Sequence, residues 1–184
     1  MLEQRIQQHF IDSAYLKDQA AQALSQPIGA AVQAMLACVT SGAKALACGH
    51  GLCAPLAQQF AVLCLSGFER ERPGLAALAL TQDALARQVH ALGQAGDLLL
   101  AISAGGDESA LAEAVQAAHE RDMTVIALCG RDGAALTSAL RETDVQICVP
   151  HDRAARVREV HMLILHCLCD GVDTQLLGEQ ETAL

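Results

Sequence analysis

The sequence predicts an α/β protein, a three-layer α/β/α sandwich around a five-stranded parallel sheet with flavodoxin-like topology, preceded by an N-terminal helical hairpin. Three observations predict it. Short apolar segments alternate with longer amphipathic ones, as in a chain of strand–helix units. These apolar segments lack polar alternation, which is typical of strands covered on both faces. Two of them run into glycine clusters that open helical segments. We expect one domain over residues 1–184, since a chain of this length buries a substantial core.

Residues 1–42 form the predicted hairpin. Leu2, Ile6 and Phe10 recur every four residues, which gives residues 2–24 an apolar stripe on one helical face. A second helix is expected to begin after Pro27, because proline is well tolerated in the first turn of a helix. It is expected to end near Gly42.

Residues 43–177 form the predicted parallel core and a long C-terminal helix. The helix over 153–177 is apolar around much of its circumference, so we expect it to be buried on more than one side and to contribute to a subunit interface. A short acidic tail over 178–184 is expected to be flexible. The five strand candidates are residues 44–48, 75–80, 97–102, 124–129 and 145–149.

Composition excludes several classes of partner. A net charge of -9 argues against direct nucleic-acid binding, which needs a basic face. No uninterrupted apolar run reaches the roughly 18 residues of a membrane span, and the N-terminus lacks a signal-type apolar core. We therefore expect a cytoplasmic protein with no membrane contact. The hydrophobic share of 52% is above the usual range for soluble domains, which favours burial between subunits and hence a homo-oligomer.

The cysteines and histidines do not indicate a metal site. The eight cysteines contain no Cys-x-x-Cys pair and most lie in apolar runs, so buried free thiols are expected. His161 and His166 are about 140° apart around a helix and do not converge on one ion. We expect no metal and no cofactor. Cys53 is the exception among the thiols, because it begins a predicted helix, where the helix dipole could lower its pKa.

The two glycine clusters are the candidate binding site for an anion, specifically a phosphosugar. In an open parallel sheet, ligands bind beyond the carboxyl ends of the strands, where backbone N–H groups at helix starts can surround an oxyanion. Tight structural turns are the alternative for each loop. The candidates are Gly49, His50, Gly51 and Cys53 in the first loop and Ser103, Gly105, Gly106 and Ser109 in the second.

Charged groups near these loops are few. Neither loop contains Lys or Arg, and the nearest candidate cations are Arg153, Arg156 and Arg158, which either face an anion or lie on a solvated helix face. Asp107 and Glu108 would repel a phosphate and more plausibly stabilise the helix dipole. Residue types alone therefore give little support to acid–base catalysis.

Most of the chain resembles the sugar isomerase (SIS) domain family, particularly its phosphoheptose isomerases and the DnaA initiator-associating protein. The resemblance implies a helical hairpin, a five-stranded parallel sheet and a homotetramer. It rests on residues 48–51, 57–61, 68–73, 77–81, 88–93, 96–103 and 156–166.

This chain departs from the isomerases at the positions that matter for catalysis. The isomerases use a His, a Glu four residues later, a Gln and a second His to hold a metal and transfer a proton. The matching positions here are Gln59, Leu63, Arg158 and His166, so only His166 is retained. The segment after the second strand is also shorter than in the family. The resemblance therefore implies that no catalytic residue set remains.

The C-terminal block over 169–177 is more similar to the DnaA initiator-associating protein. We therefore expect a non-catalytic tetramer that binds the replication initiator DnaA, with Leu176 and Leu177 either on the partner surface or packed in the subunit core.

Two alternatives remain open. One is a phosphoheptose isomerase that converts sedoheptulose 7-phosphate with a site rebuilt from His166, Asp83 and His50. The other is a sensor that binds a phosphosugar without turnover through Ser103, Gly105 and Ser109.

Overall fold

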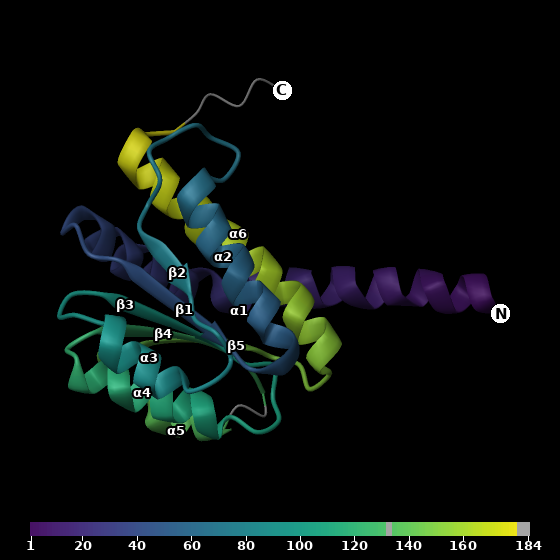
Figure 1. Ribbon diagram of the computed structural model, residues 1–184. Coiled ribbons are helices and arrows are strands. Elements are labelled where there is room, and N and C mark those ends of the chain that lie inside the picture. The colour runs from purple at the N-terminus through teal and green to yellow at the C-terminus, as the bar shows by residue number, and fades with distance from the viewer. Residues whose placement is uncertain (132–133, 180–184) are drawn as a thin grey trace.

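The computed structural model describes residues 1–131 and 134–179, and it contains a five-stranded parallel sheet in the order β2-β1-β3-β4-β5 (Figure 1). The predicted fold class is confirmed. Each strand matches a predicted apolar segment. The inner strands β1, β3 and β4 are almost entirely buried, and residues buried on both faces have no need of polar alternation. The strands are β1 (Ala45–Gly49), β2 (Ala77–Ala79), β3 (Leu98–Ile102), β4 (Thr124–Gly130) and β5 (Val145–Val149).

Helices cover both faces of the sheet (Figure 1). One layer holds α1 (Leu2–Thr40), α2 (Ala54–Ser66) and α6 (Ala154–Leu177), and the other holds α3 (Leu85–Leu92), α4 (Ser109–Glu120) and α5 (Ala134–Ala139). Side chains of β3 divide between the two layers. Leu98 and Leu100 pack with the first, and Leu99 packs with the second. Two apolar cores therefore stabilise the sheet.

β2 is shorter than the predicted strand over 75–80. Its residues Ala77–Ala79 pair only with Ala45–Ala47 of β1, since β2 lies at the edge of the sheet. Leu78 is exposed there, as is usual for an edge strand that lacks full cover.

The predicted N-terminal hairpin is wrong, because α1 is one continuous helix that contains Pro27. Proline in a helix interior removes a hydrogen bond and costs about 3 kcal/mol. A stripe of buried residues that continues on both sides of the proline offsets this cost by packing against α6 and the sheet. The stripe consists of Leu16, Ala20, Leu24, Ala31, Val32, Met35 and Cys38.

The N-terminal part of α1 projects beyond the rest of the chain (Figure 1). Its apolar side chains, among them Phe10 at 74% exposure, have little cover within the chain. α1 also contains a window long and apolar enough to span a membrane by length and composition alone, which the search for uninterrupted apolar runs missed. Core helices of soluble proteins pass the same test, so this is weak evidence and the expectation of no membrane contact stays a prediction.

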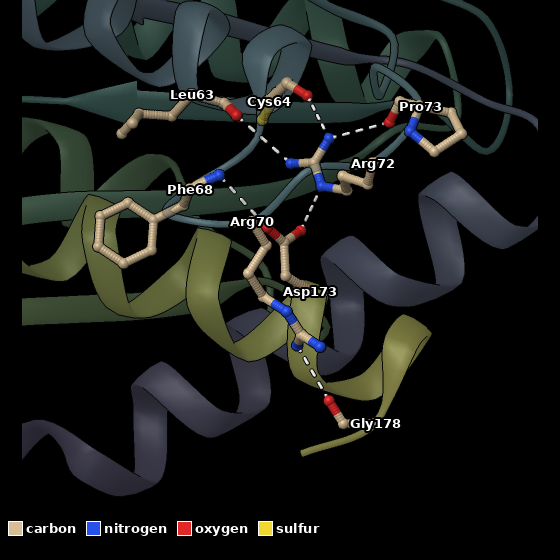
Figure 2. Close-up of polar contacts among 8 residues, drawn as sticks. All are labelled: Leu63, Cys64, Phe68, Arg70, Arg72, Pro73, Asp173 and Gly178. Atoms are coloured by element: carbon tan, nitrogen blue, oxygen red, sulfur yellow. Dashed lines mark hydrogen bonds and ion pairs between the residues drawn. The ribbon is translucent and has the colours of Figure 1, made fainter. Parts of the chain in front are cut away.

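A buried ion pair joins the loop after α2 to the end of α6 (Figure 2). The Arg72 guanidinium donates to the Asp173 carboxylate and to the carbonyl of Cys64 at the end of α2. The backbone N–H of Phe68 donates to the other oxygen of Asp173 at 3.3 Å. These bonds fix the loop that carries Phe68 against α6. Of the predicted tail, residues 180–184 lie outside the described part of the chain.

Candidate functional site

The two glycine loops meet at the point where the strand order of the sheet reverses. β1 and β3 are neighbours and Gly49 is in register with Ile102, so both strands end at the same edge. The connection after β1 turns to β2 on one side, and the connection after β3 turns to β4 on the other. Ligands in open α/β sheets bind in the crevice at this switch point. The topology therefore places the predicted loops where a ligand site is expected.

Contacts between the loops confirm that they lie close together. A backbone hydrogen bond from Ala104 reaches the Cys53 thiol. His50 lies close enough to Asp107 to help lower the pKa of that carboxyl, after the larger effect of hydrogen bonds from Ser109. The first loop forms the short 3-10 helix η1 (Gly51–Cys53), which leads into α2.

The glycines of both loops are required by the backbone. A Cβ on Gly49 would lie 2.4 Å from the carbonyl oxygen of Cys53, so the chain could not pass there with a side chain. Gly105 and Gly106 have φ of +102° and +101°, a conformation that L residues rarely adopt. The tight-turn explanation thus holds for these glycines. The N–H of Gly105 is also already used, because it donates to the Ser103 hydroxyl oxygen at 3.1 Å.

Both serines of the second loop already donate to carboxylates. The Ser103 hydroxyl is buried and donates to Glu108, whose other oxygen accepts the backbone N–H of Leu136 at 3.0 Å. Ser109 donates its backbone N–H to Asp107 at 3.0 Å. Glu108 immediately precedes α4 and is only 3% exposed, so its carboxylate is a buried acceptor at the start of that helix.

Cys53 does not have the lowered pKa that its place before a helix suggested. Burial raises the pKa of its thiol, and this outweighs the opposing effects of Arg158 and of the Ala104 backbone. Removal from water penalises the thiolate more than the helix start favours it. Cys53 is therefore a packed thiol at the centre of the site.

α6 brings one cation to this edge of the sheet. Arg158 acts electrostatically on both Cys53 and His161, which places its guanidinium beside the loops. Arg156 instead pairs with Glu159 and approaches His9 of α1 at 2.8 Å, and Arg153 is exposed at the start of α6. Of the three arginines considered from the sequence, Arg158 is the one that acts electrostatically on a residue of the candidate site.

His166 lies further along α6, where its ring stacks on Phe68 with centroids 5.1 Å apart. Leu63 is half-buried near the end of α2. It lies close to the loop that carries Phe68 and Arg72, because its carbonyl oxygen accepts a hydrogen bond from Arg72 at 3.3 Å. Asp83 is exposed beside α3, in the opposite helix layer, where its carbonyl accepts from Gln88. The structure therefore does not bring Asp83 to His166.

Two further expectations concern metals and partners. Within residues 1–131 and 134–179, no group of three or more His, Cys, Asp or Glu side chains is arranged to hold a metal. Leu176 and Leu177 are both partly exposed at the C-terminal end of α6, so neither is fully packed within this chain.

Comparison with known proteins shows the family to which the chain belongs. Residues 8–130 match the SIS domain family, and the chain belongs to it.

Within this family, the chain is similar to named enzymes along nearly its whole length. It is 57% identical to a phosphoheptose isomerase of Methylibium petroleiphilum, with 98% of each chain covered. It is 48% identical to a phosphoheptose isomerase of Azoarcus sp., with 96% of this chain and 98% of the relative covered.

Solved structures give the same result. The phosphoheptose isomerase GmhA from Neisseria gonorrhoeae superposes with a TM-score of 0.87 at 42% identity, over 95% of this chain and 100% of that one. A phosphoheptose isomerase from Francisella tularensis gives 0.89 at 39% identity, over 95% and 99%.

These findings overturn the function predicted first. The expectation of a non-catalytic factor that binds DnaA is wrong, because the similar relatives are named phosphoheptose isomerases. It rested on the C-terminal block and on the substituted positions 59, 63 and 158. Three substituted positions and a short helix end carried too little information to outweigh similarity over the whole chain.

Proposed function

We propose that this protein binds a phosphorylated heptose of the sedoheptulose 7-phosphate type at the switch-point edge of the sheet and isomerises it. The observation that carries the proposal is the 57% identity over 98% of both chains with a relative named phosphoheptose isomerase. Fold likeness alone would not support a reaction, because one fold hosts many activities.

The geometry supports binding of the phosphorylated sugar at this edge. The loops after β1 and β3 lie at the same edge of the sheet, and Arg158 adds a positive charge there in a chain whose net charge is -9. Arg158 and His166 are eight residues apart on α6, about 12 Å along the helix axis. An elongated ligand that is anchored near the loops can therefore extend along α6 toward His166.

His166 is the candidate acid–base residue. Aldose–ketose isomerisation moves a proton between neighbouring carbons and needs a group that both accepts and donates it. The half-buried His166 imidazole has two ring nitrogens, one of which can accept a proton while the other donates. Its ring stacks on Phe68, and this contact fixes the orientation of the ring. Phe68 is itself held by its backbone N–H, which donates to Asp173 (Figure 2).

A second candidate function is binding of the same ligand without turnover. Leu63 and Gln59 favour it, because an aliphatic side chain and a neutral amide cannot transfer a proton where the family resemblance implies a metal-binding Glu and His.

Turnover and binding assays separate the two candidates. The purified chain is incubated with sedoheptulose 7-phosphate, product is measured by chromatography, and binding is measured by calorimetry. Isomerisation above a no-enzyme control, lost in His166→Ala with the Kd retained, is the expected result. Binding with no turnover would establish the second candidate. Absence of both would refute each of them.

A further inference from the structure

Arg158 occupies a defined place at the carboxyl edge of the sheet. Its neighbour Val157 packs against Gly130 at the end of β4. Three residues on, His161 Nε2 lies 3.3 Å from the Cys129 carbonyl oxygen of the same strand. The turn of α6 that carries Arg158 is thus held to the sheet edge by residues on either side of it. The backbone position of Arg158 is therefore set independently of any ligand.

The guanidinium of Arg158 has no competing partner in the described part of the chain. It forms no hydrogen bond or ion pair there, and it is half-buried. The adjacent Glu159 does not neutralise it, because that carboxylate is held by Arg156 and by the Ser13 hydroxyl at 2.7 Å. An arginine that is partly removed from water and left without an anion is suited to bind one.

The buried hydroxyl of the loop after β3 is not free to hold the same anion. Its one buried hydroxyl, on Ser103, is already bound to Glu108, and that carboxylate is itself buried below the loop. A phosphate that took the Ser103 hydroxyl would break this bond and approach a negative charge in a region of low dielectric. The Ser103 hydroxyl is therefore not the donor that a phosphate at this edge would use.

We infer that Arg158, rather than the Ser103 hydroxyl, binds the phosphate group of the ligand and sets the preference of the site for phosphorylated over neutral sugars. This inference rests on the proposed function and names the residue that confers its specificity. A guanidinium forms two parallel hydrogen bonds to a phosphate, so Lys at the same position should bind more weakly.

The test compares a phosphorylated sugar with its neutral parent. Binding of sedoheptulose 7-phosphate and of sedoheptulose is measured by calorimetry on the wild-type chain, Arg158→Gln, Arg158→Lys and Ser103→Ala. Arg153→Gln is the matched control, because Arg153 is exposed at the start of the same helix. Circular dichroism and the melting temperature establish that each variant is folded.

We expect the wild-type chain to prefer the phosphorylated sugar at least tenfold. Arg158→Gln should abolish that preference, Arg158→Lys should restore part of it, and Arg153→Gln should leave it unchanged. Ser103→Ala should alter the Kd by less than about threefold.

Two outcomes would overturn the inference. If the wild-type chain binds the phosphosugar but Arg158→Gln keeps the preference, or Ser103→Ala loses as much as Arg158→Gln, then Arg158 is not the phosphate-binding residue and the proposed function stands. If the wild-type chain binds neither sugar, both the inference and the proposed function fail.

Discussion

His161 makes the folded chain sensitive to acid. It is fully buried on α6, and burial lowers the pKa of its imidazole from 6.5 to about 4. Between pH 6.5 and 4 the His161 imidazole is protonated in the unfolded chain and neutral in the folded chain. Folding stability therefore falls as pH falls through this interval. The destabilisation is roughly 3 kcal/mol when the interval has been crossed.

The measurement is urea unfolding at several pH values. His161→Leu should flatten the stability profile between pH 6.5 and 4, where the imidazole titrates. His90→Gln is the control, because the His90 side chain is exposed. An unchanged slope in His161→Leu would show that other groups cause the acid sensitivity.

Gly49 and Gly29 are predicted to respond to alanine in opposite directions. A Cβ at Gly49 would lie 2.4 Å from the backbone oxygen of Cys53, and the backbone must shift to accept it. Gly49→Ala should therefore destabilise by about 2 kcal/mol or more. Gly29 lies inside α1 with nothing within 4 Å, so Gly29→Ala should stabilise by about 1 kcal/mol. Chemical denaturation measures both, and destabilisation of Gly29→Ala would contradict the exposed setting of that residue.

The Arg72–Asp173 ion pair holds α2, its following loop and α6 together (Figure 2). Both side chains are at most 2% exposed, so Asp173→Ala leaves a buried guanidinium without a counter-charge. We expect a loss of about 3–5 kcal/mol in unfolding free energy.

The exposed Arg131–Asp152 pair is the matched control. Its side chains are 59% and 60% exposed, and Asp152→Ala should cost at most about 1 kcal/mol. Equal losses in the two variants, measured by thermal and urea unfolding, would mean that burial does not set the strength of the Arg72–Asp173 pair.

The strands were predictable and the N-terminal helix was not. Apolar segments of five or six residues predicted the parallel strands from sequence alone, and each of the five segments overlaps a strand. Pro27 suggested a helix boundary by a local rule, whereas the outcome depends on packing of α1 against α6, which local sequence does not contain.

The candidate site was predictable in its backbone and not in its side chains. The glycine clusters indicated the loops correctly, because their spacing after strands has a local cause. The hydrogen-bond partner of the Ser103 hydroxyl depends on where Glu108 is buried. The pKa of Cys53 depends on the burial of its thiol in the folded chain. Both are consequences of tertiary structure. Val157 and Val160 flank Arg158 in the sequence and are buried in the structure. This apolar pattern could have indicated that the helical turn carrying Arg158 packs against the sheet.

The chain as a unit presents an apolar surface on the projecting part of α1. Ile6, Phe10 and Ile11 are between 49% and 74% exposed. The sequence led us to expect a homotetramer, and we propose that a second copy of the chain covers this surface. Sedimentation of the wild-type chain should give an oligomer. Phe10→Glu combined with Ile6→Glu should lower its mass, because two buried charges disfavour the interface. A monomeric wild-type chain at micromolar concentration would contradict the proposal.

The central claim is that the sheet edge at the loops after β1 and β3 binds a phosphorylated heptose. A crystal structure of the chain with sedoheptulose 7-phosphate tests it most directly. We predict that the sugar phosphate lies at the carboxyl edge of the sheet, with its phosphate beside Arg158 and its sugar chain extended along α6 toward His166. A ligand bound away from both glycine loops, or no bound ligand at concentrations that saturate a phosphoheptose isomerase, would contradict the account.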